Sequence, residues 1–494
     1  MTEPLIFELN SQSKNLFGEC DVPNADAGSL IPADFLNSDG LDMPDVAEID
    51  IVRHFTHLAR LNYCVDEGFY PLGSCTMKYN PKVHEDVARY TGFSAIHPYQ
   101  PEDSIQGTLQ LLSDMESYLC QISGMDSITL QPAAGAHGES TGLMLIKAYY
   151  EKKGEGAKRR KIIIPDSSHG TNPASTTLCG YEIVEVKSDA SGNVDLKQLL
   201  SILDDSVAAL MLTNPNTLGL FEEKILDIAD MVHKAGGLLY YDGANLNALL
   251  GVVRPGDMGF DVMHFNLHKT FSTPHGSGGP GSGPVGVKKF LEAFLPYPTI
   301  ENKAGKYYLN HDRPDSIGKV KSFYGNFSVI VKAYAYVKSL GAGGLKEVAY
   351  DAVLNANYIR NELSQHFNLP YDRLCMHEFV MVPKQYAKAK VRALDIAKRM
   401  IDYGYHPPTI YFPLIVQECL MVEPTETESK ATLDNFVSAM KKIAEEAQEN
   451  PDILKASPHC DTTSKFPLNV ARLNEAKAAR ELVLTYRPET KVKQ

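Results

Sequence analysis

Between residues 127 and 267 the sequence repeats one pattern: a short, almost entirely apolar segment, a polar or glycine-containing motif, and often a segment with helical spacing. The apolar segments lie at 127–130, 161–164, 182–186, 208–212, 238–241 and 262–267. Near-continuous apolar segments are typical of strands that are covered on both faces of a sheet. The pattern therefore predicts a mainly parallel sheet covered by helices, in which ligands bind at the carboxyl ends of the strands.

The regions on either side of this repeat predict two further parts. Residues 1–100 are rich in Pro, Asp and Asn and predict an N-terminal arm with short helices. Residues 101–340 form the predicted large domain, which opens with a helix over 104–122 that ends at Gly124. Residues 341–494 predict a smaller C-terminal α+β domain and tail, with helices at 345–365, 393–403 and 470–482 and a strand at 379–382.

Charge and cysteine content exclude several classes of protein. The formal net charge of −13 argues against broad binding to nucleic acid or to a membrane surface. The longest apolar runs fall short of the roughly 20 residues that a membrane span needs, and the first residues lack a secretory signal pattern. The eight cysteines are scattered without a Cys-x-x-Cys pair. We therefore expect a cytoplasmic protein with no metal site, nucleic-acid partner or membrane attachment.

Lys269 follows the last apolar segment and precedes a glycine-rich stretch at 272–283. A lysine at a strand exit is held by the scaffold, and an amine so placed can form a Schiff base with a carbonyl cofactor. Taken alone, Lys269 is better explained as a solvated lysine before a loop. The motifs at the other strand ends make a cofactor-binding role for Lys269 the better explanation.

Two of these motifs suit a phosphorylated aromatic cofactor. Ala134, Gly135 and Ala136 lie where the first apolar segment leads into a helix, and free N–H groups at a helix start bind phosphate. A tight turn without a ligand explains this motif equally well. Asp242 ends another apolar segment and could pair with a protonated ring nitrogen, or could cap the next helix.

Two more strand ends complete the set. His169 could lie flat on a cofactor ring, although a lone loop histidine more often bonds to its own loop. Asn214 or Asn216 could donate a hydrogen bond to a phenolic oxygen, although Asn-Pro also makes turns. The order of phosphate turn, histidine, asparagine, aspartate and lysine is hard to explain as five independent coincidences.

This order resembles the fold-type-I pyridoxal-phosphate enzymes, the aspartate aminotransferase-like superfamily. Longer motifs resemble the glycine decarboxylase P-protein family, and matching segments run from about residue 60 to the tail; these motifs lie at 71–81, 168–174, 242–248, 268–276, 411–416 and 423–429. The length and the lysine-bearing motif resemble the catalytic half that occurs in some members as a separate chain, subunit 2.

The resemblance implies that pyridoxal 5'-phosphate is held as a Schiff base on Lys269, with His169 and Asp242 as further catalytic residues. The implied cofactor-binding residues are Lys269, Ala134, Gly135, Ala136, His169, Asn216, Asp242, Ala244 and His268. The implied substrate-site residues are Cys75, Thr76, Lys78 and Asn247. For Cys75 an inert small apolar residue, and for Lys78 a solvated lysine, remain alternatives. His377, Glu378 and His406 are candidate contacts from the second domain.

The implied reaction is decarboxylation of glycine, with transfer of the aminomethyl group to the lipoyl group of the H-protein and release of CO2. This is the activity of aminomethyl-transferring glycine dehydrogenase in the glycine cleavage system. The implied partners are the lipoylated H-protein and a companion subunit 1, with two of each chain. Two alternatives are a different enzyme on the same scaffold, against which the long motifs argue, and a silent subunit, against which Lys269 in its full motif argues.

Overall fold

The computed structural model describes residues 5–9, 27–36, 44, 46–60, 62–276 and 279–459. The predicted helix at 470–482 lies outside the described residues. The chain divides into two units, and Val65–Ser457 form the larger one, which carries the predicted site. The smaller unit contains η1 (Ile6–Glu8), α1 (Ala27–Leu30), η2 (Ala33–Phe35) and α2 (Glu48–Arg60).

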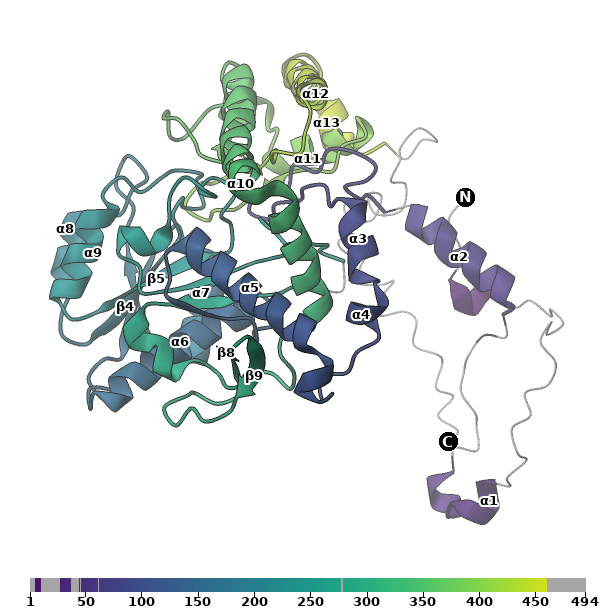
Figure 1. The fold of residues 1–494 in the computed structure, drawn as a ribbon. Helices are drawn as coiled ribbons and strands as arrows, with labels where there is room; N and C mark the ends of the chain where they lie inside the picture. Colours follow the sequence, from purple (N-terminus) through teal and green to yellow (C-terminus); the bar gives the residue numbers. More distant parts are fainter. Residues whose placement is uncertain are drawn as a thin grey trace. The chain divides into compact units, whose positions relative to one another are not determined.

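A seven-stranded sheet forms the centre of the larger unit (Figure 1). Its strands are β1 (Ser127–Thr129), β2 (Lys161–Pro165), β3 (Glu182–Val186), β4 (Val207–Leu212), β5 (Leu238–Gly243), β6 (Val262–Phe265) and β7 (Val285–Val287), in the order β1-β7-β6-β5-β4-β2-β3. Neighbours among β2 to β6 pair in parallel, and β7 pairs antiparallel with both β1 and β6. The predicted mainly parallel sheet is confirmed. The three-residue strand β7 was not predicted.

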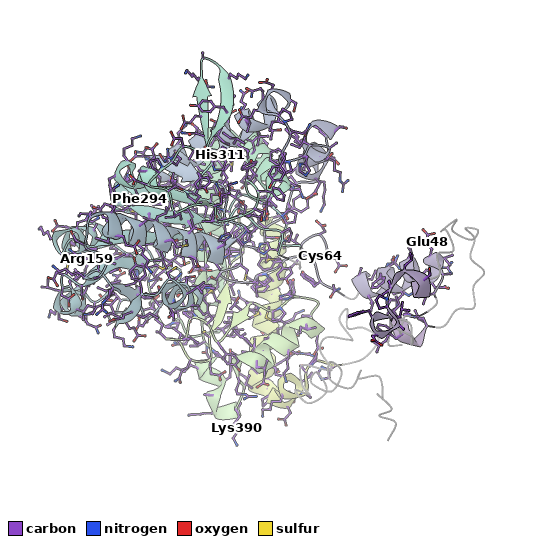
Figure 2. The ribbon with its side chains drawn as sticks, turned by 90° about the horizontal axis from the view of Figure 1, so that it is seen from below. Glu48, Cys64, Arg159, Phe294, His311 and Lys390 are labelled. Atoms are coloured by element: carbon purple, nitrogen blue, oxygen red, sulfur yellow. The ribbon has the colours of Figure 1, made fainter. Side chains whose placement is uncertain are left out.

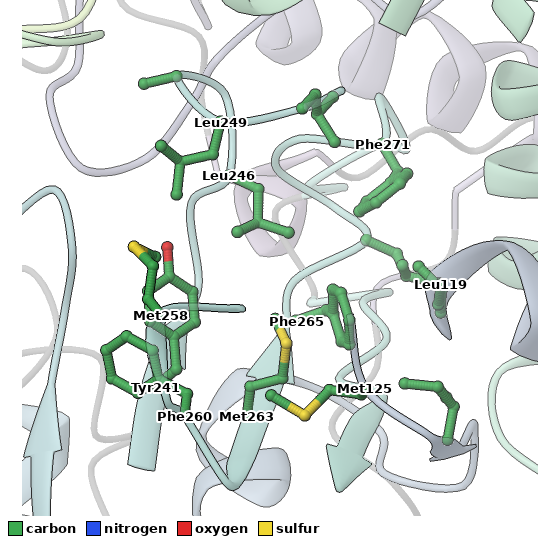
Figure 3. Close-up of a cluster of buried hydrophobic side chains, with 14 of the residues drawn as sticks. Leu119, Met125, Tyr241, Leu246, Leu249, Met258, Phe260, Met263, Phe265 and Phe271 are labelled. Carbon is green, nitrogen blue, oxygen red and sulfur yellow. The ribbon is translucent and has the colours of Figure 1, made fainter. Parts of the chain in front are cut away.

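Both faces of this sheet are covered, as the apolar strands predict. Successive residues of β5 lie in different hydrophobic clusters. Tyr241 packs against Phe260, with 4.8 Å between the ring centroids (Figure 3), whereas Tyr240 belongs to a separate cluster. Every residue of β4 and β5 is buried. The helices that follow the strands are α6 (Gly135–Lys152), α7 (Thr171–Leu178), α8 (Leu196–Ile202) and α9 (Ile225–Lys234).

Helices before and after the sheet complete this part of the unit. Those before it are α3 (Lys82–Ala88), α4 (Thr91–Ser94), η3 (Glu102–Ser104) and α5 (Gln106–Ser123). Helix α5 ends as predicted at Gly124, whose φ of 72° lies in the left-handed region that glycine adopts without strain. The short helix η4 (Pro255–Met258) lies between β5 and β6, and η5 (Lys289–Phe294) and the hairpin of β8 (Thr299–Lys303) and β9 (Lys306–Asn310) follow β7.

Helix α10 (Phe327–Leu363) leads from this part into the C-terminal part. It begins earlier than the predicted helix at 345–365, and it is interrupted at Gly341, where φ is 61° and ψ is −175°. The remaining elements are β10 (Phe379–Met381), η6 (Lys384–Ala389), α11 (Ala393–Asp402), β11 (Thr409–Ile410), β12 (Leu420–Val422), α12 (Lys430–Glu449) and α13 (Pro451–Ala456). They form the smaller α+β part, which has its own hydrophobic cluster.

The two parts of Val65–Ser457 lie side by side. Figure 2 shows Lys390 on the C-terminal part, and Arg159 and Phe294 on the part that holds the seven-stranded sheet. The predicted domain boundaries at residues 100 and 340 stay predictions.

Candidate active site

A cavity of about 280 Å³ opens at the carboxyl ends of the parallel strands. All nine residues that were predicted to bind the cofactor line it. The lining residues are Ser74, Ala134, Gly135, Ala136, Glu139, His169, Thr171, Thr213, Pro215, Asn216, Thr217, Asp242, Ala244, Asn245, Asn266, His268, Lys269, His377 and Glu378. The structure thus brings together strand ends that lie far apart in the sequence.

Lys269 lies in the loop after β6, and its Nζ donates a hydrogen bond of 2.7 Å to the carbonyl oxygen of Ser74. The loop is anchored on both sides of the lysine, because Leu267 and Phe271 are fully buried in one hydrophobic cluster, in which Figure 3 shows Phe271. Thr270 also accepts a hydrogen bond from the N–H of Leu246 at 2.8 Å. A lysine held in this way presents its amine at a fixed place, unlike a solvated surface lysine.

Asp242 is buried at the end of β5 and is surrounded by donors. Its Oδ2 accepts from Nδ2 of Asn172 at 2.8 Å, its Oδ1 accepts from the N–H of Ala244 at 3.0 Å, and His264 Nε2 lies 3.2 Å from Oδ1. Burial alone would raise the pKa of Asp242, but His264, Asn172 and Ala244 lower it below its usual value. The carboxylate is therefore ionised and can pair with a cationic ring nitrogen.

Glu139 is a second buried carboxyl group in the cavity wall, and no motif in the sequence predicted a role for it. Its Oε2 accepts from Nδ2 of Asn172 at 3.2 Å and from Oγ of Ser175 at 3.0 Å. Burial, and next the charge of Asp242, raise the pKa of Glu139 to about 8. Two neighbouring carboxyl groups thus have different protonation states, and Glu139 stays neutral beside the ionised Asp242.

We predict that Glu139→Gln flattens the pH dependence of stability. The pKa of Glu139 in the folded chain is about 8, above its usual value. The contribution of this group to stability is therefore complete below the usual pKa, and it is lost as the pH rises from there to about 8. Glutamine keeps the neutral shape, so the free energy of unfolding should fall less steeply than in wild type, by at most about 1.4 kcal/mol per pH unit. Denaturant unfolding at several pH values measures this slope. Glu151→Gln, exposed on the same helix, should match wild type; equal slopes for all three proteins would contradict the prediction.

The start of α6 suits a phosphate group. Ala134 lies at the helix N-cap without a side-chain cap, so the N–H groups of the first turn have no acceptor within the helix. Space here is tight, because a Cβ added at Gly135 would come within 2.4 Å of Asn266 Oδ1. The buried Oδ1 of Asn266 has no hydrogen-bond partner among the described residues. Helix start, ionised aspartate and fixed amine together fit pyridoxal phosphate.

Both histidines of the predicted set line the cavity. His169 is exposed, and its Nδ1 accepts from the N–H of Thr171 at 3.2 Å while its ring meets Phe412 edge-on at 5.5 Å. His169 therefore bonds to its own loop, as lone loop histidines more often do. It also lines the cavity, and its contact with a cofactor ring stays a prediction. His268 is neutral, because burial, followed by the nearby His275 and Lys269, lowers its pKa to about 3.

Asn216 lines the cavity, but its side chain is occupied by its own loop. Its Nδ2 donates to the carbonyl oxygen of Gly192 at 2.7 Å, and its Oδ1 accepts from the N–H groups of Leu218 and Leu220. These contacts match the turn-forming alternative. Hydrogen bonding of Asn216 to a cofactor stays a prediction.

The four predicted substrate-site residues are not among those that line the cavity, and three of them have polar partners elsewhere. Thr76 Oγ1 donates to Glu423 at 2.7 Å, and Nδ2 of Asn247 lies 3.4 Å from Oε2 of Glu426. Lys78 is buried, contrary to the solvated alternative, and its Nζ donates to Glu426 at 2.6 Å. Burial raises the pKa of the Cys75 thiol even though Lys269 lowers it, which agrees with an inert cysteine. A substrate role for the four residues stays a prediction.

We predict that Lys78→Met destabilises the fold by about 3–5 kcal/mol, because it leaves Glu426 buried without its cation. Chemical denaturation measures the loss, and Lys78→Met combined with Glu426→Leu should recover most of it. The matched control is Lys82→Met, which breaks an exposed pair with Asp66 and should cost less than about 1 kcal/mol. Similar losses at positions 78 and 82 would contradict this account.

Comparison with known proteins identifies the family. The family model described as glycine cleavage system P-protein matches residues 21–299, and the model described as glycine dehydrogenase, C-terminal domain, matches residues 348–459. The chain belongs to the glycine cleavage system P-protein family. Two curated relatives of this family are named probable glycine dehydrogenase (decarboxylating) subunit 2. The relative from Caldanaerobacter subterraneus subsp. tengcongensis is 57% identical over 98% of both chains, and the one from Desulforamulus reducens is 59% identical over 99% of this chain and 100% of its own.

Solved structures agree with the fold of the P-protein family. A glycine decarboxylase P-protein in inhibitor-bound form matches with a TM-score of 0.71 at 21% identity, covering 84% of this chain and 94% of that one. A sphingosine-1-phosphate lyase of Burkholderia pseudomallei matches with a TM-score of 0.59 at 14% identity, covering 85% and 96%. The predicted family and fold-type-I class are confirmed. Among the helices that the structure describes, none has the length and apolar character that a membrane span requires.

Proposed function

We propose that this chain is the cofactor-bearing half of a glycine decarboxylase, which passes the aminomethyl group of glycine to a lipoyl group and releases CO2. The activity and the pyridoxal 5'-phosphate cofactor follow from membership of the P-protein family and its fold. The observation that carries the proposal is the convergence of the amine of Lys269, the ionised Asp242 and the free start of α6 on one cavity.

Each residue of the cavity wall that faces the cofactor has a proposed task. Bound pyridoxal phosphate supplies a cationic ring that takes up the electron pair left when CO2 departs. Lys269 would anchor the group through its amine, and the first turn of α6 would hold the phosphate. Asp242 would keep a proton on the ring nitrogen, and neutral Glu139 would add no second negative charge beside it. His169, which lines the cavity beside Phe412, would limit the movement of the ring.

The transfer step balances without a further redox cofactor. The methylene carbon of glycine forms a bond to one lipoyl sulfur as the S–S bond breaks. The other sulfur takes a proton, so the electron pair released with CO2 reduces the disulfide. The residues of this chain hold the glycine-derived carbon near Lys269, and the lipoyl group enters with its carrier protein.

The partners follow from the family in the same way. The relatives named as subunit 2 imply a companion subunit 1. We propose an assembly of two copies of each chain that accepts lipoylated H-protein as its carrier. We also propose a cytoplasmic location, which the free thiols of the described cysteines support.

Release of labelled CO2 from carboxyl-labelled glycine tests the proposed function. The chain together with its companion should release the label only when lipoylated carrier is present. Release that does not depend on lipoylation, or turnover of other amino acids in preference to glycine, would favour a different enzyme on the same scaffold.

A further inference from the structure

His377 is a buried histidine of the C-terminal part that lines the cavity and has no hydrogen-bond partner among the described residues at either ring nitrogen. Its Nε2 lies 3.7 Å from Oε1 of Glu378, which is too far for a hydrogen bond. Buried polar groups in folded proteins are almost always satisfied. An unsatisfied imidazole in the wall of a cavity therefore points to a ligand.

The segment that carries His377 is connected to Lys269 through hydrogen bonds to Ser74. Glu378 Oε2 accepts from the N–H of Ser74 at 2.7 Å, and the carbonyl oxygen of the same residue accepts from Lys269 Nζ at 2.7 Å. Ser74 itself has a φ of 64°, an unusual value for a residue other than glycine. One constrained residue thus connects the lysine to the segment that carries His377.

Among the described residues that line the cavity, His377 is the imidazole that has no hydrogen-bond partner at either ring nitrogen and no task toward the cofactor. The start of α6, His169, Asp242 and Lys269 already have tasks toward the cofactor in the proposed function. No arginine, and no lysine except Lys269, is among the described residues that line the cavity. We propose that His377 donates a hydrogen bond to the carboxylate of the amino-acid substrate and so selects for it. This inference rests on the proposed function.

A neutral donor suits a carboxylate that must leave as CO2. Burial lowers the pKa of His377, so the imidazole donates without carrying a full charge. An ion pair would stabilise the ground state of the carboxylate more than the transition state, in which its charge disperses. Burial, and next Glu423, raise the pKa of Glu378 well above its usual value, so a neutral Glu378 does not repel the substrate.

A pair of aminooxy probes tests the role of His377 without relying on turnover. Aminooxyacetate carries a carboxylate and methoxyamine does not, and both form an oxime with bound pyridoxal phosphate by displacing the amine of Lys269. The rate constants of the two reactions, followed by the absorbance of the cofactor in the assembled holoenzyme, give a preference ratio. We expect His377→Phe to lower this ratio about 10- to 100-fold, the range of a hydrogen bond to a charged group, with an unchanged rate for methoxyamine. His377→Gln, which keeps an N–H donor, should retain more of the ratio.

The control is His84→Phe, which alters another buried histidine. Its Nδ1 has no hydrogen-bond partner within the described part of the chain, but it does not line the cavity. The preference ratio of this variant should equal that of wild type. A wild-type ratio in His377→Phe would overturn the inference. Equal losses in His377→Phe and His377→Gln would also overturn it, because shape rather than a donor would then set the preference. Failure of wild type to release CO2 from glycine would instead overturn the proposed function.

Discussion

We expect Lys269→Ala to lower the rate of CO2 release from glycine by at least about 10⁴-fold, the scale of losing a covalent catalytic group. The effect is this large because no other amine lines the cavity among the described residues, and the amine of Lys269 is held 2.7 Å from the carbonyl oxygen of Ser74. Lys269→Arg should fail equally, since a guanidinium keeps the charge but is not a nucleophile at neutral pH.

The matched control for this prediction is Lys288→Ala. Lys288 also donates a hydrogen bond of 2.7 Å to a backbone carbonyl oxygen, that of Gly124, but it does not line the cavity. This variant should keep the wild-type rate within a few-fold. Activity of Lys269→Ala within tenfold of wild type would exclude the lysine as the anchor.

The second large effect is expected for Asp242→Asn, which should lower kcat by about 10²–10³-fold, the usual loss for a buried electrostatic partner. Asparagine keeps the size of the side chain and the hydrogen bond from Ala244, but it removes the negative charge that holds a proton on the ring nitrogen. Steady-state kinetics and the absorbance of the bound cofactor measure the two consequences separately.

Asp261→Asn is the control for Asp242→Asn. Asp261 is also buried, but it lies directly before β6, at the opposite end of the sheet, and accepts from the N–H of Leu239 at 2.8 Å. This change should affect stability more than kcat. A kcat for Asp242→Asn within about threefold of wild type would remove Asp242 from the catalytic group.

Much of the fold and the cofactor side of the site could be predicted because both follow from local patterns. The apolar runs of β4 and β5 stand out in the sequence, and parallel strands place their carboxyl ends at one edge. Lys269 and Asp242 each follow such a run directly. Glu139 follows the predicted phosphate motif Ala134–Ala136 by three residues, but only its packing against Asn172 reveals its shifted pKa.

The substrate side of the site could not be predicted in the same way, because it depends on contacts between distant segments. Ser74 meets Lys269 across 195 positions and Glu378 across 304. No local pattern marks such pairs, so His377 and Glu378 were only candidate contacts without a role. The extent of α10 was likewise hidden, because Gly341 divides its pattern.

Borohydride reduction of the holoenzyme, followed by mass mapping of its peptides, identifies the lysine that carries the cofactor. Reduction makes the bond between the cofactor and its lysine permanent. We expect the mass of reduced pyridoxal phosphate on the peptide that contains Lys269, and we expect no such mass in the Lys269→Ala protein. A reduced adduct on another lysine, or an adduct of equal yield in Lys269→Ala, would contradict it.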